Sequence, residues 1–205
     1  MSLGNTVNHH KNGILLAYIA NKIPNIHLRK LLKIIYLIDE NFTIKRGFPL
    51  TWFDYYVWEK GPVSPEVYEV KNGAFSDYVS VSTNARGKKI INSVKPHEFL
   101  IYKEMGDFSQ SEIKEVDLLL DLYKDKSADE LSELTHTPNS IWSKVVNDNH
   151  ISFRDNGGKT NFLLPLTLLF REEDPRVEIY EDAKWNMEFQ AMLNAKHAKR
   201  NVPTS

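Results

Sequence analysis

The chain has 205 residues and a formal net charge of −1, with 41% hydrophobic and 26% charged residues. These values are typical of a globular protein with one substantial core. The balanced charge gives no global field for nucleic acid or an anionic membrane, so binding to either would need a local patch. The sequence contains no cysteine, which excludes disulfides, thiolate metal sites and cysteine nucleophiles.

Sequence motifs give no support for an enzyme, a cofactor site or a membrane protein. No apolar run approaches the roughly 20 residues of a membrane-spanning helix, and the N-terminus lacks the apolar middle of a signal peptide. We therefore expect a cytoplasmic protein. His9 and His10 have no further ligands at short spacing, and the chain has no nucleophile elbow, phosphate-binding glycine loop or His-Glu-x-x-His pair. We predict no enzymatic activity and no metal or cofactor.

Two helices are predicted before residue 50. Apolar residues at helical spacing indicate a helix over residues 12–22, which Pro24 closes. A longer helix follows and ends at Gly47, and its apolar stripe should face the core. The stripe consists of Leu28, Leu31, Leu32, Ile35, Ile38 and Phe42. Three cations should lie on its other faces: Arg29, Lys30 and Lys33.

Residues 55–68, with the sequence YYVWEKGPVSPEVY, combine a strand-like run with a helix start. Aromatic and β-branched residues favour a pleated surface, whereas Gly61-Pro62 cannot continue a strand ladder. Ser64-Pro65 offers a capping hydroxyl and a preset first φ. The stretch therefore predicts a strand, a tight turn at Gly61-Pro62, and a helix from Ser64 that ends at Gly73 with Val67 and Tyr68 turned inward.

Further elements are predicted from alternation and from helix caps. Two β-like runs, 78–82 and 89–94, should form a hairpin with a basic tip. Ser109 and Ser127 each begin a capping box, so a helix should start after each. The first of these helices should bury Ile113, Val116, Leu120 and Tyr123, and the second should bury Leu131 and Leu134. Thr137-Pro138 should cap a short helix that carries Ile141, Trp142 and Val145.

The last quarter of the chain has a weaker pattern. Residues 162–170 form an apolar run that Pro165 excludes from a central strand, so we expect extended or irregular packing there. After Asp174-Pro175, apolar residues predict a helix that runs toward the tail.

Several aromatic residues and one histidine are candidates for a binding surface. The ring nitrogens of His136 either hydrogen-bond a carbonyl and hold a turn, which we favour, or lie at a partner surface. Trp58 and Trp142 suit a core or an interface anchor, and we expect core positions. Alternation along a strand would leave part of the cluster Trp52, Phe53, Tyr55 and Tyr56 on an outer face, which is our candidate partner-binding patch. Core packing of the whole cluster is an alternative with at least as much support.

The hairpin tip carries the basic residues Arg86, Lys88 and Lys89. A basic hairpin behind a helix-helix-strand-helix order is similar to the wing of a winged-helix DNA-binding protein. Three charges would make only two or three phosphate contacts, which gives weak and salt-sensitive binding. We therefore favour a solvated loop over a nucleic-acid site.

Three parts of the chain together resemble the Panacea domain of SocA-like antitoxins, often described as phage-associated proteins. They are the helix with Leu31-Leu32-Lys33-Ile34-Ile35-Tyr36, the stretch Trp58-Glu59-Lys60-Gly61-Pro62-Val63 with Tyr68, and the segment Leu134-Thr135-His136 to Trp142. The resemblance covers residues 12–146. It implies a mainly helical domain that neutralises a partner toxin by direct contact, and in the SocA type an adaptor that delivers the toxin to a AAA+ protease.

We therefore predict an α+β, mainly α-helical protein with a small antiparallel hairpin or sheet. Residues 12–146 should form the antitoxin-like domain, and residues 151–205 a C-terminal extension that packs on it and ends in a helix. The predicted partner is a toxin protein encoded next to this chain. The alternative function is a nucleic-acid-binding regulator that uses the basic hairpin.

Overall fold

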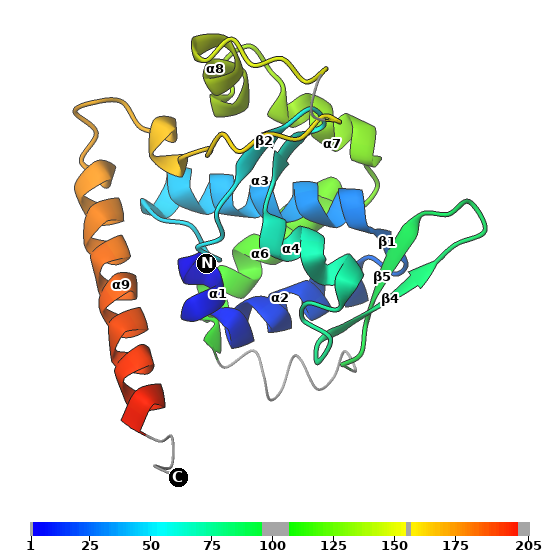
Figure 1. The fold of residues 1–205 in the computed structure, drawn as a ribbon, viewed down its shortest axis with the longest axis horizontal. Coiled ribbons are helices and arrows are strands. Elements are labelled where there is room, and N and C mark those ends of the chain that lie inside the picture. The colour runs from blue at the N-terminus through cyan, green and yellow to red at the C-terminus, as the bar shows by residue number, and fades with distance from the viewer. Residues whose placement is uncertain (1, 96–106, 155–156, 201–205) are drawn as a thin grey trace.

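The structure, a computed structural model, describes residues 2–95, 107–154 and 157–200, with the side chains of 198–200 left out. The fold is α+β and mainly helical, as predicted. The long helix α3 (Leu28–Arg46) runs through the middle of the molecule, and the other elements surround it (Figure 1).

The predicted N-terminal helices are present. A short helix α1 (Leu3–Thr6) precedes α2 (His9–Lys22), which is buried from Asn12 to Ala20. The apolar stripe of α3 is buried as predicted, and the helix ends at Gly47, whose φ of 89° suits glycine. Lys33 lies on another face than the stripe, as expected, but it is fully buried, because the β2–β3 hairpin packs on that side of α3.

Two antiparallel sheets flank the helices. The larger has the strand order β1-β5-β4, from Ile26–His27, Lys89–Ser93 and Val79–Thr83, and contains the predicted hairpin. The smaller pairs β2 (Tyr56–Trp58) with β3 (Gly61–Val63). The predicted turn at Gly61-Pro62 is therefore wrong. The chain reverses at Glu59-Lys60, and β3 tolerates Pro62 because it pairs with a neighbour on one side only.

The predicted helix after Ser64 is a short α4 (Pro65–Tyr68) that continues as a 3-10 turn, η1 (Glu69–Asn72), and ends at Gly73. Both capping boxes form: Ser109 begins α6 (Gln110–Tyr123) and Ser127 begins α7 (Ala128–Thr135). Leu131 is buried as predicted. Leu134 is 42% exposed, because it lies on the outer face of α7.

The helix α8 (Ile141–Asp148) begins later than predicted. Its N-cap is Ser140, whose hydroxyl accepts the backbone N–H of Ser143, while Thr137 and Pro138 lie in the preceding turn. A serine side chain can satisfy a free N–H at a helix start, which Pro138 at the first helical position would not do.

The C-terminal segment runs along β2 before it reaches the last helix. Val57 donates its N–H to Phe162, and Leu164 donates to Tyr55. The segment then forms a 3-10 turn, η4 (Leu166–Leu169), and the helix α9 (Arg176–Arg200). Both the irregular packing and the terminal helix were predicted. In Figure 1, α9 lies at the side of the molecule opposite the β4–β5 hairpin.

A buried carboxylate in α3 fixes the loop that leads into β2. Asp39 accepts the backbone N–H groups of Leu50 and Thr51, each at 2.9 Å, as well as the hydroxyls of Thr51 and Tyr55. Burial raises the pKa of Asp39 to about 6, although these four hydrogen bonds favour the carboxylate. The loop therefore packs against α3, and its aromatic rings point into the core.

Among the helices that the structure describes, none is both long and apolar enough to cross a membrane.

Candidate functional site

The described surface has a groove of about 790 Å³, here called the basic groove. Its walls come from the first turns of α3, the tip of the β2–β3 hairpin, the start of α7, the tip of the β4–β5 hairpin and the segment around Gly158. These elements are far apart in the sequence, so the groove exists only in the folded chain.

The groove carries an excess of positive charge. Eight lysines and arginines line it, against four carboxylates. The basic residues are Arg29, Lys30, Lys33, Lys60, Lys88, Lys89, Lys126 and Lys159, and the acidic ones are Glu59, Asp125, Asp129 and Glu130. Because the whole chain has a net charge of −1, this excess is a local feature. It provides the local patch that an anionic partner would need.

The floor of the groove is built around Lys33. The Nζ atom donates a hydrogen bond of 2.9 Å to the backbone oxygen of Pro62, which ties the β2–β3 hairpin to α3. Gly61 allows this close approach: a Cβ there would lie 2.6 Å from Thr135 Oγ1, 2.8 Å from Lys33 Nζ and 3.1 Å from His136 Nε2. The φ of Gly61 is 98°, which also favours glycine.

Burial shifts the pKa values of both basic groups in the floor. Burial, together with the nearby charge of Arg29, lowers the pKa of Lys33 to about 7. Burial, together with Lys33 and Lys60, lowers the pKa of His136 to about 4, so its ring is neutral at pH 7. The expected hydrogen bond from the ring is not present at Nε2, which is buried without a partner among the described residues.

The two tryptophans of the motif join α8 to the β2–β3 hairpin. Trp142 Nε1 donates a hydrogen bond of 3.0 Å to the backbone oxygen of Trp58. The ring of Trp142 packs against His136, with centroids 3.9 Å apart, and stacks on Phe153. The prediction that Trp58 and Trp142 are core residues is only partly right, because both are half-buried at the edge of the core.

One wall of the groove is an aromatic pair with a cation above it. The rings of Trp58 and Tyr68 meet edge to face at 4.9 Å, and Lys159 Nζ lies 4.8 Å from the centre of each. A second cation, Lys71, lies over the Tyr68 ring, with its Nζ 3.7 Å from the ring centre. Tyr68 therefore faces the groove, whereas the inward position predicted for Val67 is confirmed.

The aromatic cluster that the sequence favoured as a partner patch is mostly inside the molecule. Trp52, Phe53 and Tyr55 are buried, so the expected outer face of rings is wrong for these three. Tyr36 packs edge to face on Tyr55, and α9 covers Trp52 with the ring of Tyr180. Only Tyr56 keeps a partly accessible side chain, and its contact with a partner stays a prediction.

The motif residues, by contrast, meet in one place. Gly61, Pro62, Val63, Trp58, Tyr68, His136 and Trp142 lie in or beside the groove floor and wall. Sequence reasoning missed Lys33 and the cations of the other walls, such as Lys126 and Lys159. Lys126 and Lys159 are ordinary lysines in polar stretches, and nothing local marks them. Lys33 is a single cation within the apolar run 31–38, and this position was the available signal of its burial.

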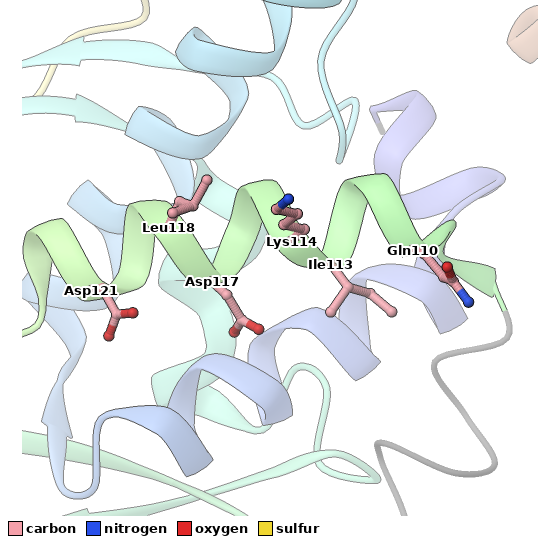
Figure 2. Close-up of a pocket in the computed structure, with 6 residues that line it drawn as sticks. All are labelled: Gln110, Ile113, Lys114, Asp117, Leu118 and Asp121. Carbon is pink, nitrogen blue, oxygen red and sulfur yellow. The ribbon is translucent and has the colours of Figure 1, made fainter.

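A second hollow of about 340 Å³ follows one face of α6, and Figure 2 shows its lining side chains. All six belong to that helix. Its central carboxylate, Asp117, accepts the hydroxyl of Tyr18 and pairs with Lys22 at 2.9 Å. With one helix as its lining and its carboxylate already paired, this hollow is a weaker candidate than the basic groove.

Comparison with known protein families gives one match. The family model described as "Antitoxin SocA-like, Panacea domain" matches residues 31–143, which is more than half of the chain. The chain belongs to this family. No curated protein and no solved structure matches it.

The Panacea match includes the residues that build the groove floor. It begins within the first turns of α3, just before Lys33, and ends in α8, just after Trp142. The segment around Lys159 and the helix α9 lie outside it. The family supports a general antitoxin role and suggests a protein without catalytic activity. The described residues contain no group of three or more His, Asp or Glu side chains that could hold a metal ion.

Proposed function

We propose that this chain is an antitoxin that neutralises a toxin protein by direct contact, and that the toxin binds in the basic groove. The observation that carries the proposal is that most residues lining the groove, those from Leu32 to Glu130, lie within the part of the chain that matches the antitoxin family. The family supports the antitoxin role, and the groove, with a volume of about 790 Å³, has room for a segment of a partner protein.

The chemistry of the groove favours an acidic segment of the toxin. The exposed ends of Lys88, Lys89 and Lys159 can pair with carboxylates. The Trp58–Tyr68 pair offers apolar ring surface beside these cations. Interfaces gain most of their energy from a few aromatic and cationic anchors, and their charges fix orientation and association rate.

The resemblance to the SocA type supports a finer role as an adaptor that delivers the toxin to a AAA+ protease. If the chain is such an adaptor, toxin turnover should depend on both the chain and the protease. A pulse-chase measurement of toxin half-life, with and without this chain, tests this role. An unchanged half-life with restored growth would mean that binding alone neutralises the toxin.

The direct test is a growth assay in which the toxin, proposed to be the product of the adjacent gene, is expressed with variants of this chain. We expect the wild type to restore growth and the triple variant Lys88→Glu, Lys89→Glu, Lys159→Glu to fail. The matched control reverses three exposed cations outside the groove, Lys114→Glu, Lys144→Glu and Arg171→Glu, and should restore growth. Melting curves confirm that each variant is folded.

Two further results would change the assignment. If Tyr56→Ala fails to restore growth and the groove variant restores it fully, the toxin site would lie at residues 52–56 instead of the groove. Nucleic acid is the alternative anionic partner, since the hairpin cations line the groove. DNA binding that falls steeply with salt, together with no binding of the toxin, would favour the regulator function over the antitoxin.

A further inference from the structure

The outer face of α9 presents aromatic and apolar side chains to solvent. Trp185 is 63% exposed, Phe189 45% and Met192 70%. The rings of Trp185 and Phe189 stack with centroids 5.6 Å apart, which forms one continuous apolar surface. A monomeric protein exposes isolated apolar residues, but a contiguous aromatic patch on one helix face is typical of an interaction surface.

The other face of α9 holds the helix against the rest of the chain. Tyr180 packs on Trp52 with ring centroids 5.4 Å apart, and the Arg176 guanidinium donates to the backbone oxygen of Ile44. Ala183, Met187 and Ala191, on this same face, are half-buried. The packing of α9 on its own chain therefore leaves the Trp185 face uncovered by any described residue.

The exposed face follows a regular pattern. Six residues recur at spacings of four, three, four, three and four, and all six are exposed: Glu178, Asp182, Trp185, Phe189, Met192 and Lys196. Apolar residues at spacings that alternate between three and four form the seam of a coiled coil, and here the apolar part of the pattern is Trp185, Phe189 and Met192. The spacing pattern reads the same in both directions, with its midpoint between Trp185 and Phe189. The seam therefore matches a second copy of itself that runs antiparallel.

Two of the three distinct contacts along the seam are complementary in the same register, the exception being Asp182 against Met192. Antiparallel alignment about the midpoint places Trp185 of one copy against Phe189 of the other. It also places Glu178, near the N-terminal end, against Lys196, near the C-terminal end. Because a two-fold axis repeats each contact, the seam gains two aromatic contacts and two ion pairs of opposite charge.

We propose that the chain forms a two-fold dimer in which the α9 helices of two copies pack antiparallel along this seam. The occupant of the apolar face is thus a second copy of this chain. The dimer does not depend on the proposed antitoxin function, because α9 lies outside the residues that match the antitoxin family.

Molar mass in solution tests the dimer. Sedimentation equilibrium of the full chain, without any toxin, should give a mass that rises with concentration from 23.7 kDa toward twice that value. The variant Trp185→Glu, Phe189→Glu should stay at the monomer mass. The matched control Leu118→Glu, Leu122→Glu changes two residues that are also exposed, at 58% and 59%, on α6, and should dimerise like the wild type. A wild-type chain that stays monomeric at several hundred micromolar would overturn the proposal, as would dimerisation of the α9 variant.

A charge exchange tests the antiparallel register. Glu178→Lys and Lys196→Glu should each weaken dimerisation several-fold at low salt, because each places like charges opposite one another twice. The double variant should recover at least half of the lost affinity, because it restores both ion pairs with reversed polarity. A double variant as weak as the single variants would overturn the antiparallel register.

Discussion

At the scale of single residues, the position of Lys33 sets the shape of the groove floor. A lysine side chain has three N–H donors and seldom lies fully buried without a carboxylate. Here Nζ donates to Pro62, and Gly61 is the residue that leaves room for it. Lys33 therefore connects α3 to the hairpin at the cost of a buried charge.

Substitution of Gly61 tests how closely the floor is packed. Gly73 has a similar φ, 100° against 98°, but a Cβ there would meet nothing within 4 Å. Gly73→Ala should therefore cost about 1–2 kcal/mol for the left-handed backbone alone. Gly61→Ala should cost roughly 1–3 kcal/mol more, because its Cβ would collide with Thr135 and Lys33. Urea unfolding measures the free energy of unfolding of both variants. Equal losses would show that Thr135 and Lys33 move away from the new Cβ without an energetic cost.

The lowered pKa of Lys33 predicts a pH dependence of stability. In the folded chain Lys33 loses its proton at about pH 7, whereas in the unfolded chain it keeps the proton up to about pH 10.5. Between these values the unfolded state binds more protons, so the free energy of unfolding rises with pH. Below about pH 7 both states are protonated and this slope disappears.

Lys33→Met isolates this contribution. The wild type should gain about 2 kcal/mol between pH 7 and pH 9 relative to Lys33→Met, because only the wild type carries the lysine. At pH 7 the variant should be at least as stable as the wild type, since it buries no charge. Denaturant unfolding at both pH values provides the measurement. If the free energy of unfolding changes with pH equally in the wild type and in Lys33→Met, the buried lysine does not titrate as described.

At the scale of elements, the sequence predicts helices better than the shape of the groove. The capping boxes at Ser109 and Ser127 are local, since each needs only its own four residues, and both form. The stripe of α3 is equally local. The burial of Lys33 depends on a carbonyl 29 positions away, and the burial of Trp52 depends on α9. Distant contacts of this kind leave no periodic signal in the sequence.

The tryptophan contact between α8 and β2 allows a prediction at this scale. Full burial of Trp142 would predict a loss of roughly 3–5 kcal/mol for Trp142→Ala. Because the ring is half-buried, we expect about 2 kcal/mol, together with a weaker attachment of α8. Leu122→Ala, at a residue that is 59% exposed, is the control and should change stability by less than about 0.5 kcal/mol. Thermal or chemical unfolding compares them, and a loss no larger than that of the control would mean that the contact contributes little.

At the scale of the whole molecule, two surfaces lie on opposite sides of the core. The basic groove includes Lys88 and Lys89 at the tip of the β4–β5 hairpin, and α9 lies at the opposite side of the molecule from this hairpin (Figure 1). In a dimer formed through α9, both basic grooves would therefore stay accessible to toxin. The division into an antitoxin domain over 12–146 and an extension over 151–205 stays a prediction, since the C-terminal segment also pairs with β2.

The most direct test of the antitoxin assignment is a titration of the purified chain with the proposed toxin by isothermal calorimetry. We expect saturable binding, with one toxin for each groove, that weakens as salt increases. The variant Lys88→Glu, Lys89→Glu, Lys159→Glu should bind at least about tenfold more weakly, and the control Lys114→Glu, Lys144→Glu, Arg171→Glu should bind like the wild type. Absence of binding by the wild type, or equal affinity of the groove variant, would contradict a toxin site in the basic groove.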